Sequence, residues 1–370
     1  MRIAVPTEIK VHEYRVAITP VGVDELVRKG HEVFVQAGAG VGSSMPDEAY
    51  VTAGATVLPT AEETWAAGEM VLKVKEPIEE EFGLLRDDLV LFTYLHLAAD
   101  EPLTQALIDA RTTAIAYETV QLPSGLLPLL YPMSEVAGCL APQVGAHAMM
   151  KAQGGRGVLM GCVGGVQNAK VVVLGGGTAG QNAANVALGM GADVTILDTD
   201  LEKLRQTFWR YDNRVSGIMS TDMAVREQVL GADMVIGTVL LPGERAPKLV
   251  TNEMVAHMKP GSVLVDVAID QGGCFEDSHP TTHDDPTFMV HQSVFYCVAN
   301  MPGAVPNTST WALTNATLPY VLRIAKAGWR EALAADPALA KGLNVQDGTI
   351  RNAGVARAFP DLPYEPYDAS

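Results

Sequence analysis

Lys170-Val-Val-Val-Leu-Gly175-Gly-Gly177-Thr-Ala-Gly180 is the stretch of sequence that decides the fold. An apolar run leads directly into the pattern G-x-G-x-x-G, and a helix-forming segment, Gln181–Met190, follows. Gly175 permits a tight turn, Gly177 lets a phosphate approach the bare backbone, and Gly180 lets the helix pack closely on the strand. The positive end of the helix dipole then faces the phosphates. The pattern predicts the strand, turn and helix of a dinucleotide-binding α/β domain.

An acidic residue at the end of the next predicted strand supports this interpretation. Asp198 follows the strand Asp193–Leu197 and lies eighteen residues after Gly180. A carboxylate at that position accepts hydrogen bonds from the ribose hydroxyls of the adenosine half. It also repels a 2′-phosphate, and Thr199 offers no compensating cation, so we expect NAD rather than NADP. A plain structural turn remains the alternative, but strand, helix and spaced acid together favour an NAD site.

Short aliphatic runs alternate with amphipathic segments on both sides of this motif, which is typical of α/β proteins with parallel sheets. We expect two Rossmann-like domains with the active site in the cleft between them. The predicted strands are Ile3–Val5, Glu32–Gln36, Met70–Lys75, Leu89–Tyr94, Ala114–Tyr117, Lys170–Gly175, Asp193–Leu197, Met234–Gly237, Val263–Val267 and Phe295–Val298. The predicted helices include Pro20–Lys29, Glu101–Ala110, Ala179–Met190 and Leu201–Trp209.

A Pro- and Gly-rich stretch, Gln121–Pro132, separates the two sets of strands. The segment Ser134–Gln153 after it predicts a connecting helix, with Ser134 as a reasonable N-cap. A last helical segment, about residues 310–333, has an apolar face that we expect to dock back on the first domain. The predicted substrate and catalytic domain is therefore discontinuous, 1–128 plus 306–370, and the predicted NAD-binding domain is 129–305.

Composition excludes several classes of protein. The 370 residues carry 26 basic and 43 acidic side chains, a net charge of −17, which disfavours binding to a nucleic-acid backbone. Pro, Gly or charge interrupts every apolar run before the ~18 residues of a membrane span, and the start resembles no signal peptide. The four cysteines show no C-x-x-C pairing, so we expect reduced thiols and no metal site. The prediction is a soluble, cytoplasmic protein.

Candidate chemistry lies at predicted strand ends in the first domain. Arg15 precedes a helix that Thr19 caps, where its planar fork could bind a small carboxylate; a surface ion pair with Glu8 or Glu13 is equally open. Lys73 and Lys75 share one strand face, and Lys75 is the one expected to reach a ligand; the alternative is a solvated edge strand.

Two further candidates suit acid–base chemistry. His96 follows the strand Leu89–Tyr94, and a histidine suits general acid–base work, although a buried structural histidine is the common alternative. Asp270 ends Val263-Leu-Val-Asp266-Val-Ala-Ile-Asp270 and leads into Gly272 and Gly273. Asp266 shares its parity, but Asp270 lies at the crevice end, which favours a site over a solvated loop.

These segments together resemble the alanine dehydrogenase/pyridine nucleotide transhydrogenase family, and alanine dehydrogenases in particular. The resemblance runs in order from residue 2 to about 320. Besides the glycine motif, it rests on Val5-Pro-Thr-Glu8, Glu13-Tyr-Arg15-Val-Ala-Ile-Thr-Pro20, Leu72-Lys-Val-Lys75-Glu-Pro77, Tyr94-Leu-His96-Leu-Ala98, Pro132-Met-Ser134-Glu-Val-Ala-Gly138, Asp266-Val-Ala-Ile-Asp270-Gln-Gly-Gly273 and Val298-Ala-Asn300-Met301-Pro302.

The resemblance implies a reversible, NAD-dependent oxidative deamination of L-alanine to pyruvate and ammonium by a homo-hexamer. It implies that Arg15 and Lys75 bind the substrate and that His96 and Asp270 are the catalytic pair. Which of these two activates the water, the physiological direction and the tolerance for larger side chains stay open. The implied cofactor residues are Ser134, Gly175, Gly177, Thr178, Ala179, Gly180, Asp198, Lys203, Ser220, Val239, Leu240, Val267, Ala268, Ile269, Asp270, Val298, Ala299, Asn300 and Met301.

Two departures and three rivals qualify the resemblance. His279 and Asn307 stand where some members carry basic residues, which bears on cofactor affinity. The first rival is the NAD(H)-binding subunit of a proton-translocating transhydrogenase, whose pattern lacks the Tyr94-Leu-His96 segment. A non-catalytic NAD-binding regulator would need none of the first-domain residues. A saccharopine-type dehydrogenase would differ only in the walls of its pocket.

Overall fold

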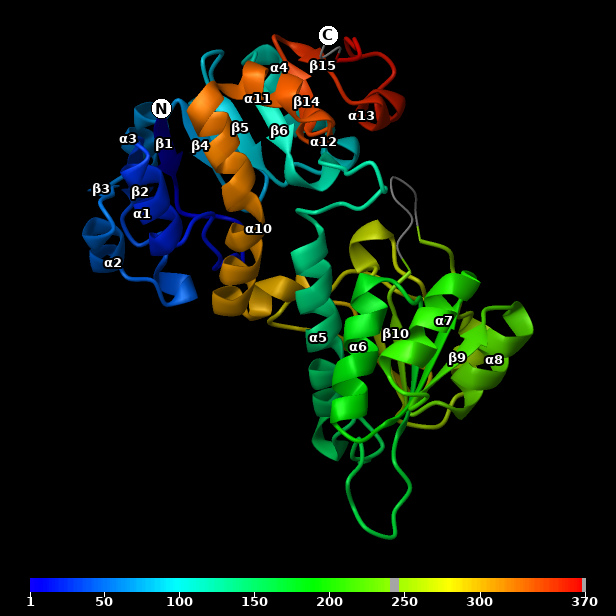
Figure 1. Cartoon of the computed structure of the whole chain (residues 1–370). Coiled ribbons are helices and arrows are strands. Elements are labelled where there is room, and N and C mark those ends of the chain that lie inside the picture. Colours follow the sequence, from blue (N-terminus) through cyan, green and yellow to red (C-terminus); the bar gives the residue numbers. More distant parts are fainter. Residues whose placement is uncertain (240–245, 368–370) are drawn as a thin grey trace. The chain divides into compact units, whose positions relative to one another are not determined.

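The computed structural model describes residues 1–239 and 246–367, and the chain divides into two compact units. Unit 1 comprises Met1–Met133 and Val305–Ser370, and unit 2 comprises Ser134–Ala304. Each unit contains one mostly parallel sheet with helices packed against it (Figure 1). The predicted fold class, an α/β protein with two Rossmann-like parallel sheets, is confirmed.

The sheet of unit 1 has the order β15-β14-β6-β5-β4-β1-β2-β3. Its strands are β1 (Arg2–Val5), β2 (Glu32–Gln36), β3 (Thr56–Leu58), β4 (Met70–Leu72), β5 (Val90–Thr93), β6 (Thr113–Ala116), β14 (Leu343–Gln346) and β15 (Thr349–Ile350). The first six are parallel, whereas β14 and β15 run antiparallel to their neighbours. The strand order reverses between β1 and β4, and ligands of such sheets bind beside this point.

The helices of unit 1 are α1 (Pro20–Arg28), α2 (Asp47–Thr52), α3 (Ala61–Ala67), α4 (Glu101–Asp109), α10 (Pro306–Ala327), α11 (Trp329–Ala335), α12 (Pro337–Ala340) and α13 (Ala353–Ala358). Thr19 caps α1 as expected, because its hydroxyl accepts a hydrogen bond from the Gly22 amide at 3.2 Å. Helix α10 packs in unit 1, where the Thr310 hydroxyl accepts a hydrogen bond from the Val16 amide at 3.1 Å.

The sheet of unit 2 has the order β12-β13-β11-β10-β7-β8-β9. Its strands are β7 (Lys170–Leu174), β8 (Asp193–Asp198), β9 (Val215–Met219), β10 (Met234–Gly237), β11 (Val263–Asp266), β12 (Thr287–Val290) and β13 (Ser293–Tyr296). All neighbours are parallel except the pair β12–β13. The strand order reverses between β7 and β10, so this sheet repeats the arrangement of the first.

The helices of unit 2 are α6 (Thr178–Gly189), α7 (Leu201–Arg210), α8 (Asp222–Gly231) and α9 (Asn252–Ala256), with most of α5 (Tyr131–Ala148). Helices α5 and α6 lie side by side (Figure 1), and a Cβ on Gly138 would lie 2.3 Å from the Ala179 carbonyl oxygen. Glycine at 138 is therefore required where the two helices cross.

Two sequence expectations about local structure are wrong. The connecting helix begins at Tyr131, so Ser134 lies inside α5 and is not its N-cap. Pro132 occupies the first turn, where its missing N–H needs no partner, so the helix starts earlier than the apolar pattern indicates. Strand β4 ends at Leu72 and not at Lys75, because Lys73 turns into a buried ion-pair cluster described below.

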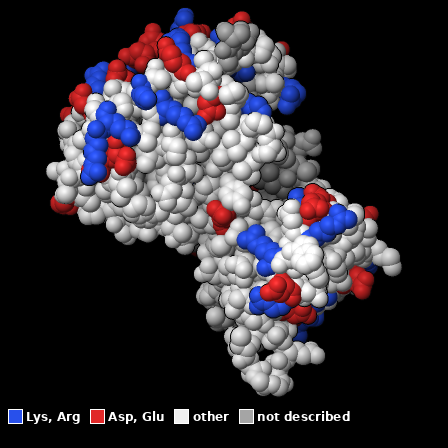
Figure 2. All heavy atoms as spheres, viewed as in Figure 1, with Lys and Arg blue, Asp and Glu red and all other residues white. Residues whose placement is uncertain are grey.

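The described surface carries both signs of charge. On the face drawn in Figure 2, Lys and Arg side chains lie interspersed with Asp and Glu side chains. Among the described residues, no helix has the length and apolar character needed to span a bilayer.

The contact between Gly180 and the preceding turn yields a stability prediction. A Cβ at Gly180 would lie 1.8 Å from the Gly175 carbonyl oxygen and 2.8 Å from the Thr238 hydroxyl. Because backbone cannot yield as a flexible side chain does, we expect Gly180→Ala to lower the free energy of unfolding by about 3 kcal/mol or more. Urea denaturation followed by circular dichroism measures this.

Gly189 is the matched control, because it lies in the same helix and its Cβ would meet nothing within 4 Å. Gly189→Ala should leave stability unchanged or raise it by up to about 1 kcal/mol. Equal stability of the two variants would contradict the close approach at Gly180.

Candidate active site

The first-domain candidates all follow parallel strands of unit 1. The loop that carries Arg15 follows β1, Lys75 follows β4, and His96 follows β5. The carboxyl ends of parallel strands meet at one edge of a sheet, and β1 and β4 flank the reversal of strand order. The fold therefore brings these three side chains to the edge of the unit 1 sheet where ligands of such sheets bind.

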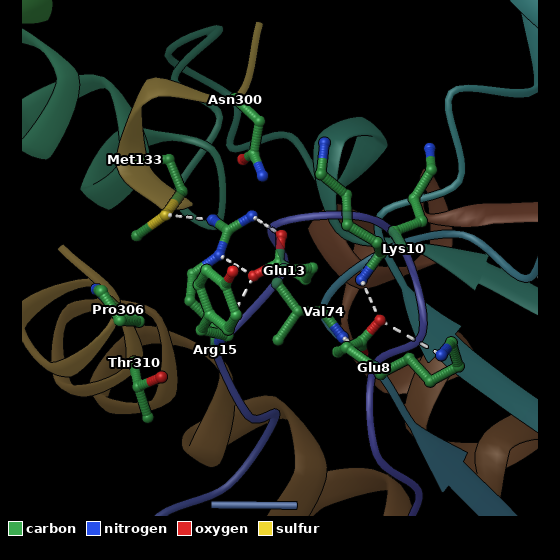
Figure 3. Close-up of polar contacts among 12 residues, drawn as sticks. Glu8, Lys10, Glu13, Arg15, Val74, Met133, Asn300, Pro306 and Thr310 are labelled. Atoms are coloured by element: carbon green, nitrogen blue, oxygen red, sulfur yellow. Dashed lines mark hydrogen bonds and ion pairs between the residues drawn. The ribbon is translucent and has the colours of Figure 1, made fainter. Parts of the chain in front are cut away.

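Arg15 is buried and held by Glu13 (Figure 3). The Arg15 side chain is 2% exposed, and its Nε donates to Glu13 Oε1 at 2.6 Å while Nη2 donates to Oε2. Nη1 lies 3.0 Å from the sulfur of Met133. Burial alone would lower the pKa of Arg15, but Glu13 outweighs it and raises the pKa, so the guanidinium is charged. The ion pair with Glu13 exists, but it is not on the surface as the alternative had it.

Lys73 is the centre of a second buried charge cluster. Its side chain is 1% exposed, and its ammonium lies 3.1 Å from Glu8 and 2.8 Å from Glu81. Desolvation lowers the pKa of Lys73, but the two carboxylates outweigh it and raise the pKa. Because β4 lies between β1 and β5, Lys73 is not on a solvated edge strand, and that alternative is wrong.

Glu8 also fixes the backbone that leads to Lys75. Its carboxylate accepts a hydrogen bond from the Val74 amide at 2.6 Å (Figure 3). It also accepts one from the Lys75 amide at 3.4 Å. Lys75 itself is half-buried. No sequence pattern assigned this function to Glu8; the available signal was an acidic residue in the loop after β1, a strand that neighbours β4.

His96 is exposed and conformationally strained. Its side chain is 44% exposed, and its backbone has φ 51°, in the left-handed region. The backbone amide donates to Glu118 at 2.7 Å, and the ring Nδ1 lies 3.4 Å from Glu76. Strain of this kind clusters at functional sites, and the exposure makes the imidazole accessible to a ligand. The alternative of a buried structural histidine is wrong.

The glycine turn of unit 2 has the geometry that its pattern predicted. Gly175 has φ 103°, which favours glycine, and Gly180 allows the close contact of α6 with the turn. A Cβ at Gly177 would meet nothing within 4 Å, so the backbone there faces open space. Thr178 and Ala179 begin α6, and the first backbone N–H groups of a helix have no partner within it and suit an anion. These residues fit a pyrophosphate.

Asp198 lies at the end of β8 beside this turn. Its carboxylate is nearly buried and accepts hydrogen bonds from the amides of Gly176 at 2.6 Å and Asp200 at 2.8 Å. Lys203 Nζ lies 3.4 Å from it. Thr199 supplies no cation, but Lys203, which the resemblance implied as a cofactor residue, lies beside Asp198 because α7 returns it to the strand end. The Ser220 amide donates to the Asp198 carbonyl oxygen at 3.0 Å, which places Ser220 at the same edge.

The other proposed cofactor residues follow neighbouring strands. Val239 follows β10, Val267–Asp270 follow β11, and Val298–Met301 follow β13, so all lie at the carboxyl edge that carries the glycine turn. Ser134 lies in α5. Leu240 lies outside the described residues.

Asp266 and Asp270 have different environments. Asp266 is fully buried and accepts hydrogen bonds from the amides of Ala268 at 3.1 Å and Cys274 at 2.9 Å and from the Ser278 hydroxyl. Asp270 is exposed in a 3-10 turn, Ile269–Gln271. Asp266 therefore fixes the loop, and Asp270 is the carboxylate that the loop presents.

The two departures from the family pattern both make contacts within the protein. His279 stacks on Phe288 with ring centroids 3.7 Å apart, and the Asn307 amide donates to the Ser43 carbonyl oxygen at 2.7 Å. Within the described ranges, no three His, Cys, Asp or Glu side chains converge as metal ligands.

Comparisons with known proteins agree across both units. The family model "Alanine dehydrogenase/PNT, N-terminal domain" matches residues 4–137, and "Alanine dehydrogenase/PNT, C-terminal domain" matches residues 141–353. An alanine dehydrogenase of Mycolicibacterium smegmatis is 60% identical over 98% of each chain. A solved L-alanine dehydrogenase is 51% identical, with a TM-score of 0.95 over 98% of this chain and 99% of that one. A solved transhydrogenase of Sinorhizobium meliloti is 27% identical, with a TM-score of 0.81 over 95% and 99%.

The environment of Asp198 yields a binding prediction. If the carboxylate accepts hydrogen bonds from the ribose, Asp198→Ala should weaken NAD binding about tenfold to a hundredfold, the range for lost hydrogen bonds to a charged group. Isothermal titration calorimetry with NAD measures this.

Asp200 provides the control, because its side chain caps α7 and accepts from the Glu202 amide at 2.8 Å. Asp200→Ala should cost about 1 kcal/mol of stability and leave NAD affinity unchanged. Unchanged NAD affinity in Asp198→Ala would refute the ribose assignment.

Proposed function

The chain belongs to the alanine dehydrogenase family, and we propose that it catalyses the reversible, NAD-dependent oxidative deamination of L-alanine to pyruvate and ammonium. It is accordingly an oxidoreductase that acts on the CH–NH2 group of an amino acid. The observation that carries the proposal is that each unit, taken by itself, has a set of site residues at the ligand-binding edge of its own sheet. Arg15, Lys75 and His96 lie at the ligand-binding edge of one sheet, and the glycine turn, Asp198 and Asp270 lie at that of the other.

The residues of unit 2 would hold the dinucleotide. The open backbone at Gly177 and the start of α6 suit the pyrophosphate, and Asp198 suits the ribose. Bound NAD supplies the hydride acceptor. We keep NAD over NADP because Asp198 is nearly buried among backbone amides, and Lys203 is already paired with it. The remaining cofactor residues follow by the resemblance, Leu240 included.

The residues of unit 1 would bind and activate the substrate. The Arg15 guanidinium, held by Glu13, is suited to the substrate carboxylate, and the Lys75 ammonium to the carbonyl oxygen of pyruvate or the water that becomes it. The substrate ammonium group first gives up a proton, and removal of hydride from the α-carbon then leaves a protonated imine, which Lys75 would make more electrophilic.

Hydrolysis of that imine needs a base and an acid. A base must take a proton from the attacking water, and an acid must protonate the departing nitrogen. His96 and Asp270 are both exposed to solvent and are the proposed pair. The net reaction consumes L-alanine, NAD⁺ and water and yields pyruvate, NH4⁺, NADH and a proton. The position of the active site between the two units stays a prediction.

The rival functions have less support. The transhydrogenase structure is 27% identical, against 51% for the L-alanine dehydrogenase structure. A regulator would not need a strained, exposed histidine beside two carboxylates.

Assembly and location are also proposals. The resemblance implies a homo-hexamer, and several apolar side chains are largely exposed, among them Val11 (82%), Leu159 (66%) and Trp209 (76%). Sedimentation velocity measures the assembly. The four free cysteines suit the reducing cytoplasm, which is the proposed location.

The assay offers NAD with L-alanine, glycine, L-serine or L-lysine, each alone, and follows the absorbance of NADH. We expect fast reduction with L-alanine and at most slow reduction with the others. Faster reduction with L-lysine or L-serine would identify a different substrate. NAD binding without reduction would favour the function of a transhydrogenase subunit.

His96→Ala tests the catalytic assignment in the same assay. We expect turnover to fall at least about a hundredfold, the lower end for loss of a general acid–base group, with NAD affinity retained. Loss of NAD affinity instead would make His96 structural.

A further inference from the structure

Glu118 holds the backbone at His96 in its unusual conformation. Its carboxylate accepts hydrogen bonds from the Leu95 amide at 3.2 Å and from the His96 amide at 2.7 Å. Two adjacent backbone amides donate to this one carboxylate. These hydrogen bonds offset the energetic cost of the left-handed backbone conformation at His96, which residues other than glycine usually avoid. Glu118 comes from the turn after β6, so the neighbouring strand end determines the direction of the His96 side chain.

Glu76 acts on the imidazole ring. Its Oε2 lies 3.4 Å from His96 Nδ1, and its side chain is only 10% exposed. Desolvation would raise the pKa of Glu76, but the bond to His96 and the charge of Lys75 outweigh it and lower the pKa, so the group is a carboxylate that only accepts. Nδ1 therefore carries the hydrogen, and Nε2 is left as the nitrogen that exchanges protons.

Lys10 binds the other oxygen of the same carboxylate. Its Nζ pairs with Glu76 Oε1, and its side chain is 37% exposed. Lys10 comes from the loop after β1, which also carries Arg15. One carboxylate is therefore shared between the ring of His96 and a lysine in contact with solvent.

The charged groups that face His96 are Glu118, Glu76 and Lys75, and the Tyr94 ring stacks on the imidazole with centroids 5.8 Å apart. Desolvation and Lys75 lower the pKa of His96, but the two carboxylates outweigh them, so the net effect raises the pKa. The positive charge of Lys10, which pairs with Oε1 of Glu76, partly neutralises the negative charge of that carboxylate.

We propose that Glu118, Glu76 and Lys10 are positioning residues for His96. Glu118 fixes the backbone conformation of His96, and Glu76 fixes the tautomer of its ring. Lys10 weakens the attraction between Glu76 and the ring, because it pairs with the same carboxylate. This inference deepens the proposed function and rests on it only where His96 exchanges protons with the reactants. The pH dependence of the enzyme would then respond to changes at the partly exposed Lys10.

The test measures His96 in the free, full-length protein. Diethyl pyrocarbonate acylates neutral imidazole, and peptide mass spectrometry isolates the rate at His96 as a function of pH. Glu76→Gln removes the charge and keeps the shape, so the midpoint should move to lower pH and the rate near pH 6 should rise about threefold. Lys10→Met should move the midpoint to higher pH and slow that rate about threefold.

The double variant decides whether Lys10 acts through Glu76. Lys10→Met should have no further effect in the Glu76→Gln background, because the carboxylate that connects them is gone. Lys29→Met is the matched control, since Lys29 pairs with Glu25 on α1 and should not change the midpoint. Unchanged midpoints in both single variants, or additive shifts in the double variant, would overturn the inference.

Steady-state kinetics provide the second readout. Glu118→Gln should lower kcat about tenfold or more and leave the KM for NAD unchanged, and the acid limb of kcat in Glu76→Gln should follow the acylation midpoint. Equal losses in kcat and NAD affinity would indicate general damage and overturn the positioning role. A wild-type protein that does not oxidise L-alanine, but shows the expected acylation shifts, would reject the proposed function and leave the positioning of His96 intact.

Discussion

The meeting of parallel strand ends at a reversal of strand order is the constraint on which both units depend. In each sheet successive strands are added on opposite sides of one central pair, which is β1 and β4 in unit 1 and β7 and β10 in unit 2. The loops beside that pair must diverge, which leaves space for a ligand. In unit 2 the space exists because α6 approaches the Gly175 carbonyl closely enough to exclude any Cβ at Gly180. Among the described residues, the proposed site residues other than Ser134 lie at the end of a parallel strand or in the loop or helix start that follows it.

In unit 1, buried ion pairs lie in the loops beside the reversal of strand order. Lys73 lies between Glu8 and Glu81, and Arg15 pairs with Glu13, all nearly or fully buried. Such groups contribute little net stability, since desolvation offsets attraction, but removal of one partner leaves a buried charge that costs about 3–5 kcal/mol. Their value here is geometric, because they hold the loops that present Arg15 and Lys75 in one conformation.

The sequence predicted the central strands well and the edges badly. β2 and β10 match their predicted ranges, since each has an apolar run, Val33–Val35 and Met234–Ile236, within its strand. Strands β3, β9 and β12 were missed because they are short or half-exposed and lack such a run. Strand β14 was missed too, although it is mostly buried, because its pairing with β6 bridges segments far apart in the chain. Ser134 was misplaced because Pro132 starts α5 earlier than its apolar face indicates.

The sequence alone determined the fold class and the glycine turn. It also indicated Asp198, Arg15, Lys75, His96 and Asp270 as candidates, because they lie at or after predicted strand ends. The tertiary structure decided what surrounds them. Glu13, Glu76 and Glu118 hold Arg15 and His96, Glu8 fixes the backbone at Lys75, and Lys203 returns to Asp198. Several of these partners come from separate loops, and acidic residues are common along the chain. Only the order of strands in the sheet determines which carboxylate lies beside which functional group.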